Sequence, residues 1–250
     1  MDSWKFFDIT HQEHIVCNPM SEAKIQRGVD LLRLPRNGRV LDIATGKGEF
    51  ITRLVEQYGV SGTAVDLSPH HSRDARERFA ARVPDADLTM LEMDAADYQP
   101  DELASFDMTA CLGASWIWNG HEGTLKALMG WTKPGGQIVV GEPFWKKEPS
   151  PEFLAASEYE RDMFSSHHGN AQIGIDLGLR LTHTIVSSAD DWENYYALYW
   201  YAADRYALAH PNDPDVPALL QKVRENQQEF LRWERDELGW AIYMFRKIAG

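Results

Sequence analysis

The stretch from Arg39 to Ile51, Arg-Val-Leu-Asp-Ile-Ala-Thr-Gly-Lys-Gly-Glu-Phe-Ile, decides how the rest of the chain is interpreted. Val40, Leu41 and Ile43 form a short, largely β-branched apolar run, interrupted by Asp42, which is typical of a strand buried on both faces. Small residues follow at 44–48, where a tight turn must pass close to a ligand. Apolar residues then recur at helical spacing from Phe50 onward. The order predicts a strand, a glycine-rich turn and a helix that together hold a nucleoside-type ligand.

Two features separate this turn from a dinucleotide site. A dinucleotide fingerprint needs Gly-x-Gly-x-x-Gly, but Ile51 stands where the third glycine would allow close packing under a pyrophosphate. Asp42 is badly placed beside phosphates, whereas its carboxylate suits a ligand that carries a cationic ammonium group. An NAD-dependent oxidoreductase is therefore the less favoured alternative.

A second acidic residue follows at the spacing that a ribose site requires. Asp66 ends the next predicted strand, residues 60–67, about 20 residues beyond the glycine turn. Its two carboxylate oxygens match the two neighbouring hydroxyl groups of a ribose. We interpret Asp66 as a ribose ligand rather than as a solvated acid at a strand end.

The ordered motifs of residues 38–142 resemble those of the class I S-adenosylmethionine-dependent methyltransferases. Motif I of that family is usually Asp-x-Gly-x-Gly-x-Gly, and Ala44 replaces the first glycine here. Asp94-Ala95 follows a third predicted strand at 87–93, and Phe106-Asp107 opens a fourth at 106–113. Lys133-Pro134-Gly135-Gly136 precedes a fifth at 137–141. Several flanking stretches look like a bacterial subgroup that methylates small molecules.

The resemblance implies a fold, a cofactor and a set of ligands. The fold is α/β, a Rossmann-like doubly wound sheet of seven strands whose last strand is antiparallel. The cofactor is S-adenosylmethionine, with S-adenosylhomocysteine as product. Asp42 and the turn would hold its methionine end, Asp94 its adenine, and Leu112-Gly113 would pass beneath the sulfonium. The expected cofactor-binding residues are Asp42, Ala44, Gly46, Gly48, Asp66, Leu67, Asp94, Ala95, Cys111 and Gly113.

We expect one domain over residues 1–250, with two additions to the sheet core. Residues 1–34 would form a helical cap, and residues 35–189 and 238–250 the Rossmann-like core. The final strands are predicted at 179–187 and 239–248, with a helix at 151–166 before them. Residues 190–237, which include a helix at 215–236, would form a helical lid inserted before the last strand, because long insertions at the ligand end of a sheet are often lids.

Aromatic and titratable side chains near the strand ends are the candidates for the acceptor site. Aromatic rings suit a flat ring or, by cation–π attraction, a methylammonium group, although they would serve equally well as core. The candidates are Trp116, Trp118, Phe144, Trp145, Tyr196 and Trp200. A general base is needed only if the nucleophile must lose a proton. The candidates for that base are His121, Glu142 and His14, with His11 beside them.

Composition limits the partners. The formal charge of −13 repels a phosphate backbone, so nucleic acid is an unfavourable substrate. No apolar stretch approaches the ~20 residues that span a bilayer, and no signal-peptide pattern begins the chain. Cys17 and Cys111 lack metal spacing and favour a reducing, cytoplasmic compartment. We see no metal site, and expect a monomer or homodimer.

The function expected from the sequence is transfer of a methyl group to a small molecule. Nitrogen or sulfur is favoured as the accepting atom, and oxygen is possible. A sulfonium already carries its leaving group, so the protein must mainly align the reactants and exclude water. The alternative is a non-catalytic sensor or scaffold that binds S-adenosylmethionine.

Overall fold

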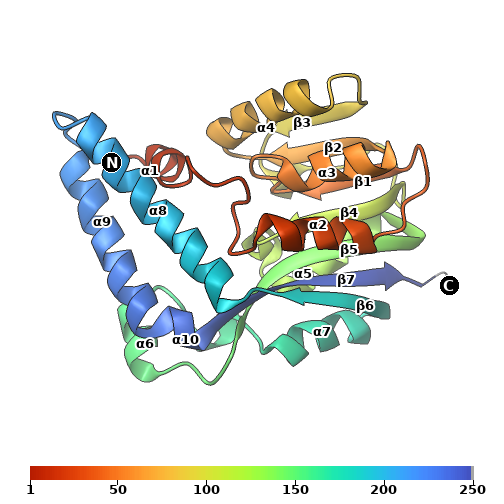
Figure 1. The fold of residues 1–250 in the computed structure, drawn as a ribbon. Coiled ribbons are helices and arrows are strands. Elements are labelled where there is room, and N and C mark those ends of the chain that lie inside the picture. The colour runs from red at the N-terminus through yellow and green to blue at the C-terminus, as the bar shows by residue number, and fades with distance from the viewer. Residues whose placement is uncertain (249–250) are drawn as a thin grey trace.

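A mixed seven-stranded sheet is the centre of the computed structural model, which describes residues 1–248 (Figure 1). The strand order is β3-β2-β1-β4-β5-β7-β6, and β7 runs antiparallel to both of its neighbours. The predicted fold class is confirmed. The strands are β1 Arg39–Ile43, β2 Ser61–Asp66, β3 Leu88–Glu92, β4 Phe106–Leu112, β5 Thr132–Trp145, β6 Leu179–Val186 and β7 Leu238–Lys247.

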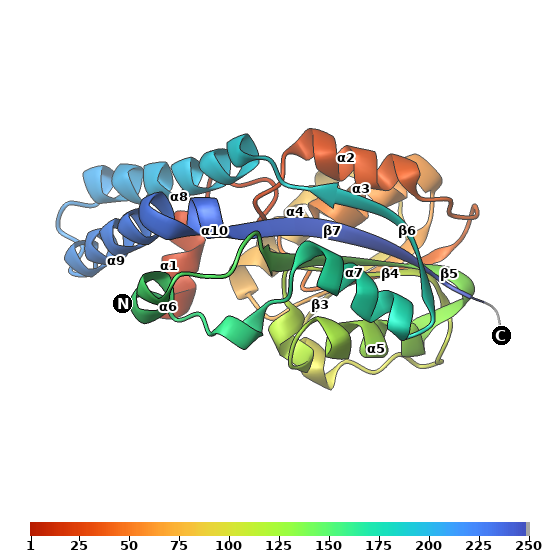
Figure 2. The ribbon, with the colours of Figure 1, turned by 90° about the horizontal axis from the view of Figure 1, so that it is seen from below.

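Helices cover both faces of the sheet (Figure 2). One face carries α2 Glu22–Leu31, α3 Glu49–Tyr58 and α4 Pro69–Arg82, and the other carries α5 His121–Trp131 and α7 His167–Asp176. The apolar side chains of β1 show why both layers are needed, since Val40 packs in one buried cluster and Leu41 in the other. Because β1 pairs with both β2 and β4, the strand order switches there, and ligands of such sheets bind at that point.

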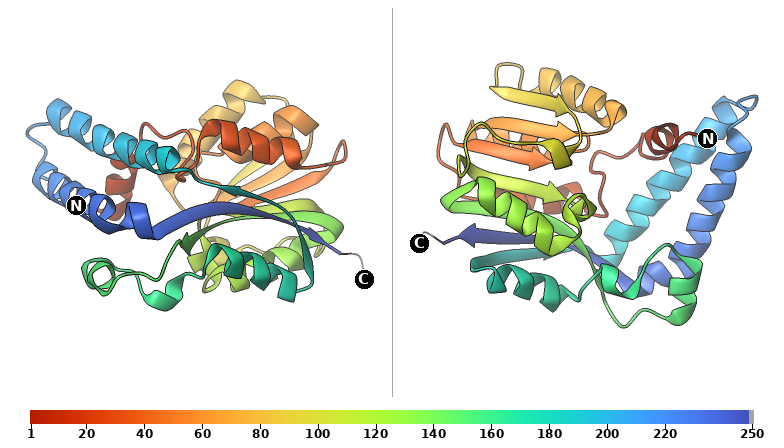
Figure 3. Two further views of the ribbon diagram at one scale, coloured as in Figure 1. Left: turned by 60° about the horizontal axis from the view of Figure 1, so that its bottom comes forward. Right: turned by 180° about the vertical axis from the view of Figure 1, so that it is seen from behind.

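A second helical body lies beyond the carboxyl ends of the parallel strands (Figure 3). It consists of α1 Ser3–Thr10, α8 Ala189–Ala209 and α9 Val216–Glu229. These helices bury a small apolar cluster of their own, which includes Phe6, Tyr199 and Leu219. α8 begins with a capping box, in which Ser188 and Asp191 each bind the other's backbone N–H. The predicted insertion between the last two strands is therefore helical and faces the ligand edge of the sheet.

Several predicted boundaries differ from the structure. The helix expected at 151–166 is only α6 Pro151–Ala156 and a 3-10 turn, Arg161–Met163, and between them Tyr159 packs edge to face on Phe153. The helix α7 was not predicted. The Lys133–Gly136 turn lies at an irregular start of β5, where the register with β4 shifts. α2 covers the sheet beside α3, so the segment outside the core is shorter than residues 1–34.

The chain between α9 and β7 also departs from the predicted continuous helix at 215–236. α9 ends at Glu229, and a π-helical turn, Phe230–Glu234, and a short helix α10, Arg235–Glu237, follow. Short 3-10 turns lie after β3 and β4, at Ala95–Asp97 and Ser115–Trp118. π-helical turns interrupt the regular hydrogen-bond pattern and occur often at functional sites.

Candidate functional site

Three residues of the glycine-rich turn after β1 have left-handed backbone conformations. Ala44, Gly46 and Gly48 have φ values of 51°, 56° and 73°. At Gly48 a Cβ atom would lie 2.6 Å from the ring of Phe79, so a larger residue would have to displace α4. Ala44 shows that a small side chain is tolerated at the first position of the motif.

Asp42 lies under this turn and is buried. The Thr45 hydroxyl donates a hydrogen bond of 2.6 Å to its Oδ2 atom. Burial raises the pKa of Asp42 to about 7, against the effect of that hydrogen bond. A cationic ligand group would favour the ionised carboxylate.

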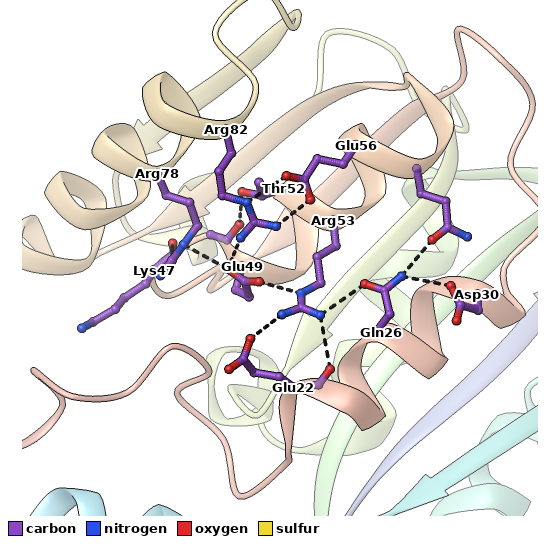
Figure 4. A network of polar contacts seen from close by, with 12 residues as sticks. Glu22, Gln26, Asp30, Lys47, Glu49, Thr52, Arg53, Glu56, Arg78 and Arg82 are labelled. Atoms are coloured by element: carbon purple, nitrogen blue, oxygen red, sulfur yellow. Dashed lines mark hydrogen bonds and ion pairs between the residues drawn. The ribbon is translucent and has the colours of Figure 1, made fainter.

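An ion-pair network fixes the turn from the outside (Figure 4). Glu49, the first residue of α3, is 4% exposed and pairs with Arg53, Arg78 and Arg82 at 2.6–3.0 Å. Arg78 also donates to the carbonyl oxygen of Lys47 within the turn. These contacts join α4 to the start of α3, and they hold Glu49 as a structural group.

Asp66 connects the turn to the end of β2. Its two carboxylate oxygens accept hydrogen bonds from the backbone N–H groups of Gly46 and Ser68, at 2.8 Å and 2.9 Å. The Nδ1 atom of His71 lies 3.7 Å from Oδ1. Burial lowers the pKa of His71, but Asp66 and Cys17 outweigh it and raise that pKa to about 10. Each carboxylate oxygen keeps a free lone pair for a further donor.

The remaining rim comes from the ends of β3 and β4. The exposed Asp94 accepts a hydrogen bond of 2.9 Å from the N–H of Ala96, which leaves its other oxygen free. Gly113 has a φ of 85°, and a Cβ atom there would lie 2.6 Å from Nδ2 of Asn18. Asn18 itself donates to the Leu112 carbonyl oxygen at 3.1 Å. The N-terminal segment therefore lies directly against the rim.

One cavity of about 790 Å³ runs from this rim into the helical body. That volume lies toward the upper end of the range for small-molecule sites, about 300–1,000 Å³. Of the predicted residues it is lined by Asp42, Ala44, Gly46, Asp66, Leu67, Asp94, Ala95, Gly113, Trp116, His11 and Tyr196. The structure thus brings most of the predicted cofactor ligands to one cavity.

Two predicted cofactor residues and three predicted bases do not line this cavity. Gly48 supports the turn from behind, and Cys111 is fully buried within β4. His14 hydrogen-bonds through Nε2 to the Tyr195 carbonyl oxygen at 2.9 Å and borders a separate hollow. The other two are His121 and Glu142, which lie beneath the rim on the side of α5.

His121 and Glu142 form a buried polar pair. Glu142 accepts a hydrogen bond of 2.9 Å from the Ser115 hydroxyl, and its Oε2 atom lies 3.8 Å from Nδ1 of His121. Burial raises the pKa of Glu142 to about 8 and lowers that of His121 to about 4. The pair therefore holds neutral side chains near pH 7, away from the cavity.

Four of the predicted acceptor-site aromatics pack as core instead. Trp118 contacts Trp131 edge to face, and Phe144 packs on His167. The indole of Trp145 donates to the Arg161 carbonyl oxygen. The fourth is Trp200, whose Nε1 donates to Asn226 of α9. Phe144 and Trp145 are buried, because β5 extends as far as Trp145, and Trp118 and Trp200 are half-buried between neighbouring elements.

A second set of residues, which the sequence did not predict, also lines the cavity. They come from the N-terminal segment, from the loop after α6, from α8, from the π-helical turn and from β7. The most polar and aromatic of them are Asn18, Tyr159, Trp192, Tyr195, Glu234 and Trp240. The aromatic spacing along α8 was a signal for Trp192, but no motif pointed to Glu234.

Sequence and structure comparisons agree with this geometry. A methyltransferase-domain family matches residues 40–136. A methyltransferase from Thiobacillus denitrificans, solved with S-adenosylhomocysteine, is 30% identical, with a TM-score of 0.89, and the match covers 98% of this chain and 99% of that one. The chain belongs to the S-adenosylmethionine-dependent methyltransferases. S-adenosylmethionine is accordingly its cofactor, and the basis for an NAD-dependent alternative falls away.

Two other relatives match the methyltransferase over nearly its whole length. One from Geobacter sulfurreducens, also solved with S-adenosylhomocysteine, is 26% identical with a TM-score of 0.90, covering 96% of this chain and 97% of that one. The uncharacterized protein YjhP of Escherichia coli is 27% identical over 245 residues, which are 97% of this chain and 98% of YjhP. The structure of YjhP has a TM-score of 0.90 and covers 98% of this chain. The helical body is thus shared and not peculiar to this chain.

Residues 1–248 contain neither a cluster of metal ligands nor a membrane-spanning helix. The structure brings no three His, Cys, Asp or Glu side chains close enough together to hold a metal ion. Within the same residues, no helix has both the length and the apolar character that crossing a membrane requires.

Proposed function

We propose that this methyltransferase transfers a methyl group to a small-molecule nucleophile bound in the aromatic end of its cavity. Nitrogen or sulfur is favoured as the accepting atom, with oxygen possible. The observation that carries the proposal is the continuity of the cavity, which joins the acidic rim at Asp66 to the aromatic side chains of α8. A cofactor and a second small molecule would lie side by side in it.

The rim residues fit the parts of S-adenosylmethionine. In our proposal Asp42 and the turn hold the methionine end, Asp66 the ribose and Asp94-Ala95 the adenine. The left-handed glycines support this assignment, because the backbone approaches a ligand closely where Cβ atoms are missing. When bound, the cofactor supplies a methyl group that its sulfonium has already activated.

The chain's own contribution is alignment and exclusion of water. Residues 1–20 and α8 cover the cavity from the side opposite to the sheet, through Trp4, Phe7, His11 and Tyr195. We propose that they act as a lid over the cofactor and acceptor, since nearness and dryness are what a methyl displacement needs.

The charge distribution supports a small acceptor over a nucleic acid. A net charge of −13 repels a polyanion. Cys17 and Cys111 are both free thiols, which supports a reducing, cytoplasmic setting.

Labelled methyl transfer tests the proposal. The purified protein is incubated with methyl-labelled S-adenosylmethionine and, separately, with a pooled metabolite extract, RNA, DNA and protein. We expect label in the metabolite fraction. Label that enters only the macromolecules would overturn the small acceptor, and cofactor binding without any transfer would favour the sensor or scaffold.

A further inference from the structure

Glu234 is a buried acid at the far end of the cavity. It ends the π-helical turn that follows α9, is 2% exposed, and lines the cavity opposite the glycine turn. A regular α-helix would continue from α9 through this position, whereas the π-helical turn changes the direction in which the side chain projects. Nothing in the proposed cofactor site uses this carboxyl group.

The partners of Glu234 are two phenols and no cation. The hydroxyl of Tyr196 donates to Oε2 at 2.6 Å, and that of Tyr159 to Oε1 at 3.4 Å. Within residues 1–248 no Lys, Arg or His forms an ion pair with Glu234, and the nearby Lys146 donates to the Arg235 carbonyl oxygen instead. A buried carboxylate without a cationic partner is costly, so a cationic ligand would relieve a cost that the folded chain carries.

Aromatic side chains line the cavity on which Glu234 lies, and two of them, Tyr159 and Tyr196, contact its carboxyl group. Tyr159, Tyr196, Trp192, Tyr195 and Trp240 all line the same cavity. The Nε1–H of Trp192 is buried without a hydrogen-bond partner, which leaves a donor available to a ligand. Faces of Trp and Tyr attract alkylammonium groups, and they do so more strongly when water is excluded.

The charges along the cavity favour a cation as well. Among its described lining residues Lys47 is the sole Lys or Arg, and Asp74 pairs with it at 3.3 Å. The raised pKa of His71 makes that ring a second cation, and it lies at the rim, 3.7 Å from the Asp66 carboxylate. Burial lowers the pKa of His11 to about 3, so its ring is neutral at pH 7. An acceptor that carries a phosphate or carboxylate would lack the arginine that such groups commonly use.

We propose that Glu234 and the surrounding aromatic rings form the acceptor subsite, that it binds an alkylamine as its ammonium cation, and that Glu234 takes the proton from the nitrogen. The inference rests on the proposed function and names its substrate class. The proton moves from nitrogen to a carboxylate oxygen, which leaves a neutral amine with a free lone pair and a neutral carboxylic acid. Burial brings the two groups closer in acidity, since it raises the pKa of Glu234 to about 7 and lowers that of an ammonium.

The test measures binding rather than turnover. The protein is saturated with S-adenosylhomocysteine and titrated with tetramethylammonium chloride in a calorimeter, at constant ionic strength, with tert-butanol as the uncharged analogue. We expect tetramethylammonium to bind at least about tenfold more tightly than tert-butanol. Equal or weaker binding would overturn the subsite, while intact S-adenosylhomocysteine binding would leave the proposed methyl transfer standing.

Single substitutions distinguish the effect of the Glu234 charge from that of the shape of the subsite. Glu234→Gln keeps the shape and should weaken tetramethylammonium binding about tenfold or more, with S-adenosylhomocysteine affinity unchanged. Asp236→Asn, an exposed acid two residues on, is the matched control and should bind as the wild type does. Tyr196→Phe removes the hydrogen bond but keeps the ring, and should retain most of the binding. A Glu234→Gln protein with wild-type affinity, or a Tyr196→Phe protein as defective as Glu234→Gln, would overturn the proposal.

Proton release on binding supplies a second readout. Calorimetry in buffers with different ionisation enthalpies should show that tetramethylammonium binding releases protons near pH 7 from the wild type, but not from Glu234→Gln. Equal proton release from both proteins would remove Glu234 as the group that ionises when the cation binds.

Discussion

The two ends of the cavity are built from different parts of the chain by different physical means. At the rim, short turns after successive strands place carboxylates and backbone groups, and Asp66 alone accepts two backbone hydrogen bonds. At the helical end, large aromatic rings from distant segments converge on Glu234, a single buried acid. The rim is polar and held by main-chain geometry, whereas the helical end is apolar and held by side-chain packing.

The difference shows which part of the fold binds the cofactor and which part selects the acceptor. A cofactor shared by many enzymes can be held by strand ends and turns that the fold supplies. An acceptor that differs among enzymes needs a surface that changes without disturbing the sheet, and α8, α9 and the π-helical turn lie outside it. In our account the rim holds the cofactor and the helical end selects the acceptor.

The largest expected effect comes from breaking the main-chain geometry of the rim. Gly48 and Gly59 flank the same helix α3, and both have left-handed φ values. Gly48→Ala would meet Phe79, so we expect it to cost about 2–5 kcal/mol of unfolding free energy. Gly59→Ala meets no atom within 4 Å and should cost only about 1–2 kcal/mol. Urea unfolding measures both, and equal costs would show that the close approach to α4 is unimportant.

The next largest effect is a loss of S-adenosylhomocysteine affinity that should differ between the two rim acids, Asp66 and Asp94. Asp66→Ala should weaken S-adenosylhomocysteine binding by about 1.5–3 kcal/mol, because it removes a charge-assisted hydrogen bond in a buried setting. Asp94 is exposed, so Asp94→Ala should cost about 0.5–1.5 kcal/mol. Calorimetry on folded variants measures both values. Unchanged affinity in Asp66→Ala would reject the ribose assignment.

A smaller effect, on the pH dependence of the unfolding free energy, tests whether Glu142 is a buried structural group or part of the cavity. Its pKa is raised from 4.5 to about 8, so the folded state binds this proton more tightly than the unfolded state. The stability that it contributes is complete below pH 4.5 and is lost as the pH rises through 8. Glu142→Gln should flatten the fall in unfolding free energy between pH 4.5 and 8 by up to about 1.4 kcal/mol per pH unit.

His121 titrates in the opposite sense and over a window that overlaps that of Glu142 only below pH 6.5. Burial depresses its pKa from 6.5 to about 4, so its contribution is lost as the pH falls through that range. It therefore does not imitate the effect of Glu142 between pH 6.5 and 8. Because neither residue lines the cavity, methyl transfer by Glu142→Gln should stay near the wild-type rate. A loss of turnover of ~100-fold with unchanged cofactor affinity would instead restore Glu142 as a base.

The smallest effect is a change in the dynamics of the helical end. If residues 1–20 and α8 act as a lid, S-adenosylhomocysteine should slow hydrogen exchange there by about threefold to tenfold, while the centre of the sheet stays unchanged. Strong protection of these segments without ligand, with no further change on binding, would mean that they are fixed structure.

The sequence predicted the rim better than the helical end for a physical reason. Strand, turn and helix are local patterns, so Asp42, Gly46 and Asp66 could be located from neighbouring residues alone. Glu234 reaches the cavity through a π-helical turn and lies near Tyr159, which is distant in the chain, and no local pattern encodes that meeting. Phe144 and Trp145 were misplaced for a related cause, because aromatic residues after a strand suit a cavity wall and a core equally well.

The central claim is that the rim of the cavity holds the cofactor and the helical end holds the acceptor. A crystal structure with S-adenosylhomocysteine tests this claim most directly, because it shows which end of the cavity the cofactor occupies. We expect the adenine beside Asp94-Ala95, the ribose hydroxyls on Asp66, and the sulfur facing the space between Gly113 and Glu234. A ligand whose adenine lies among Trp192, Tyr195 and Tyr196, with its sulfur directed away from Glu234, would contradict the account.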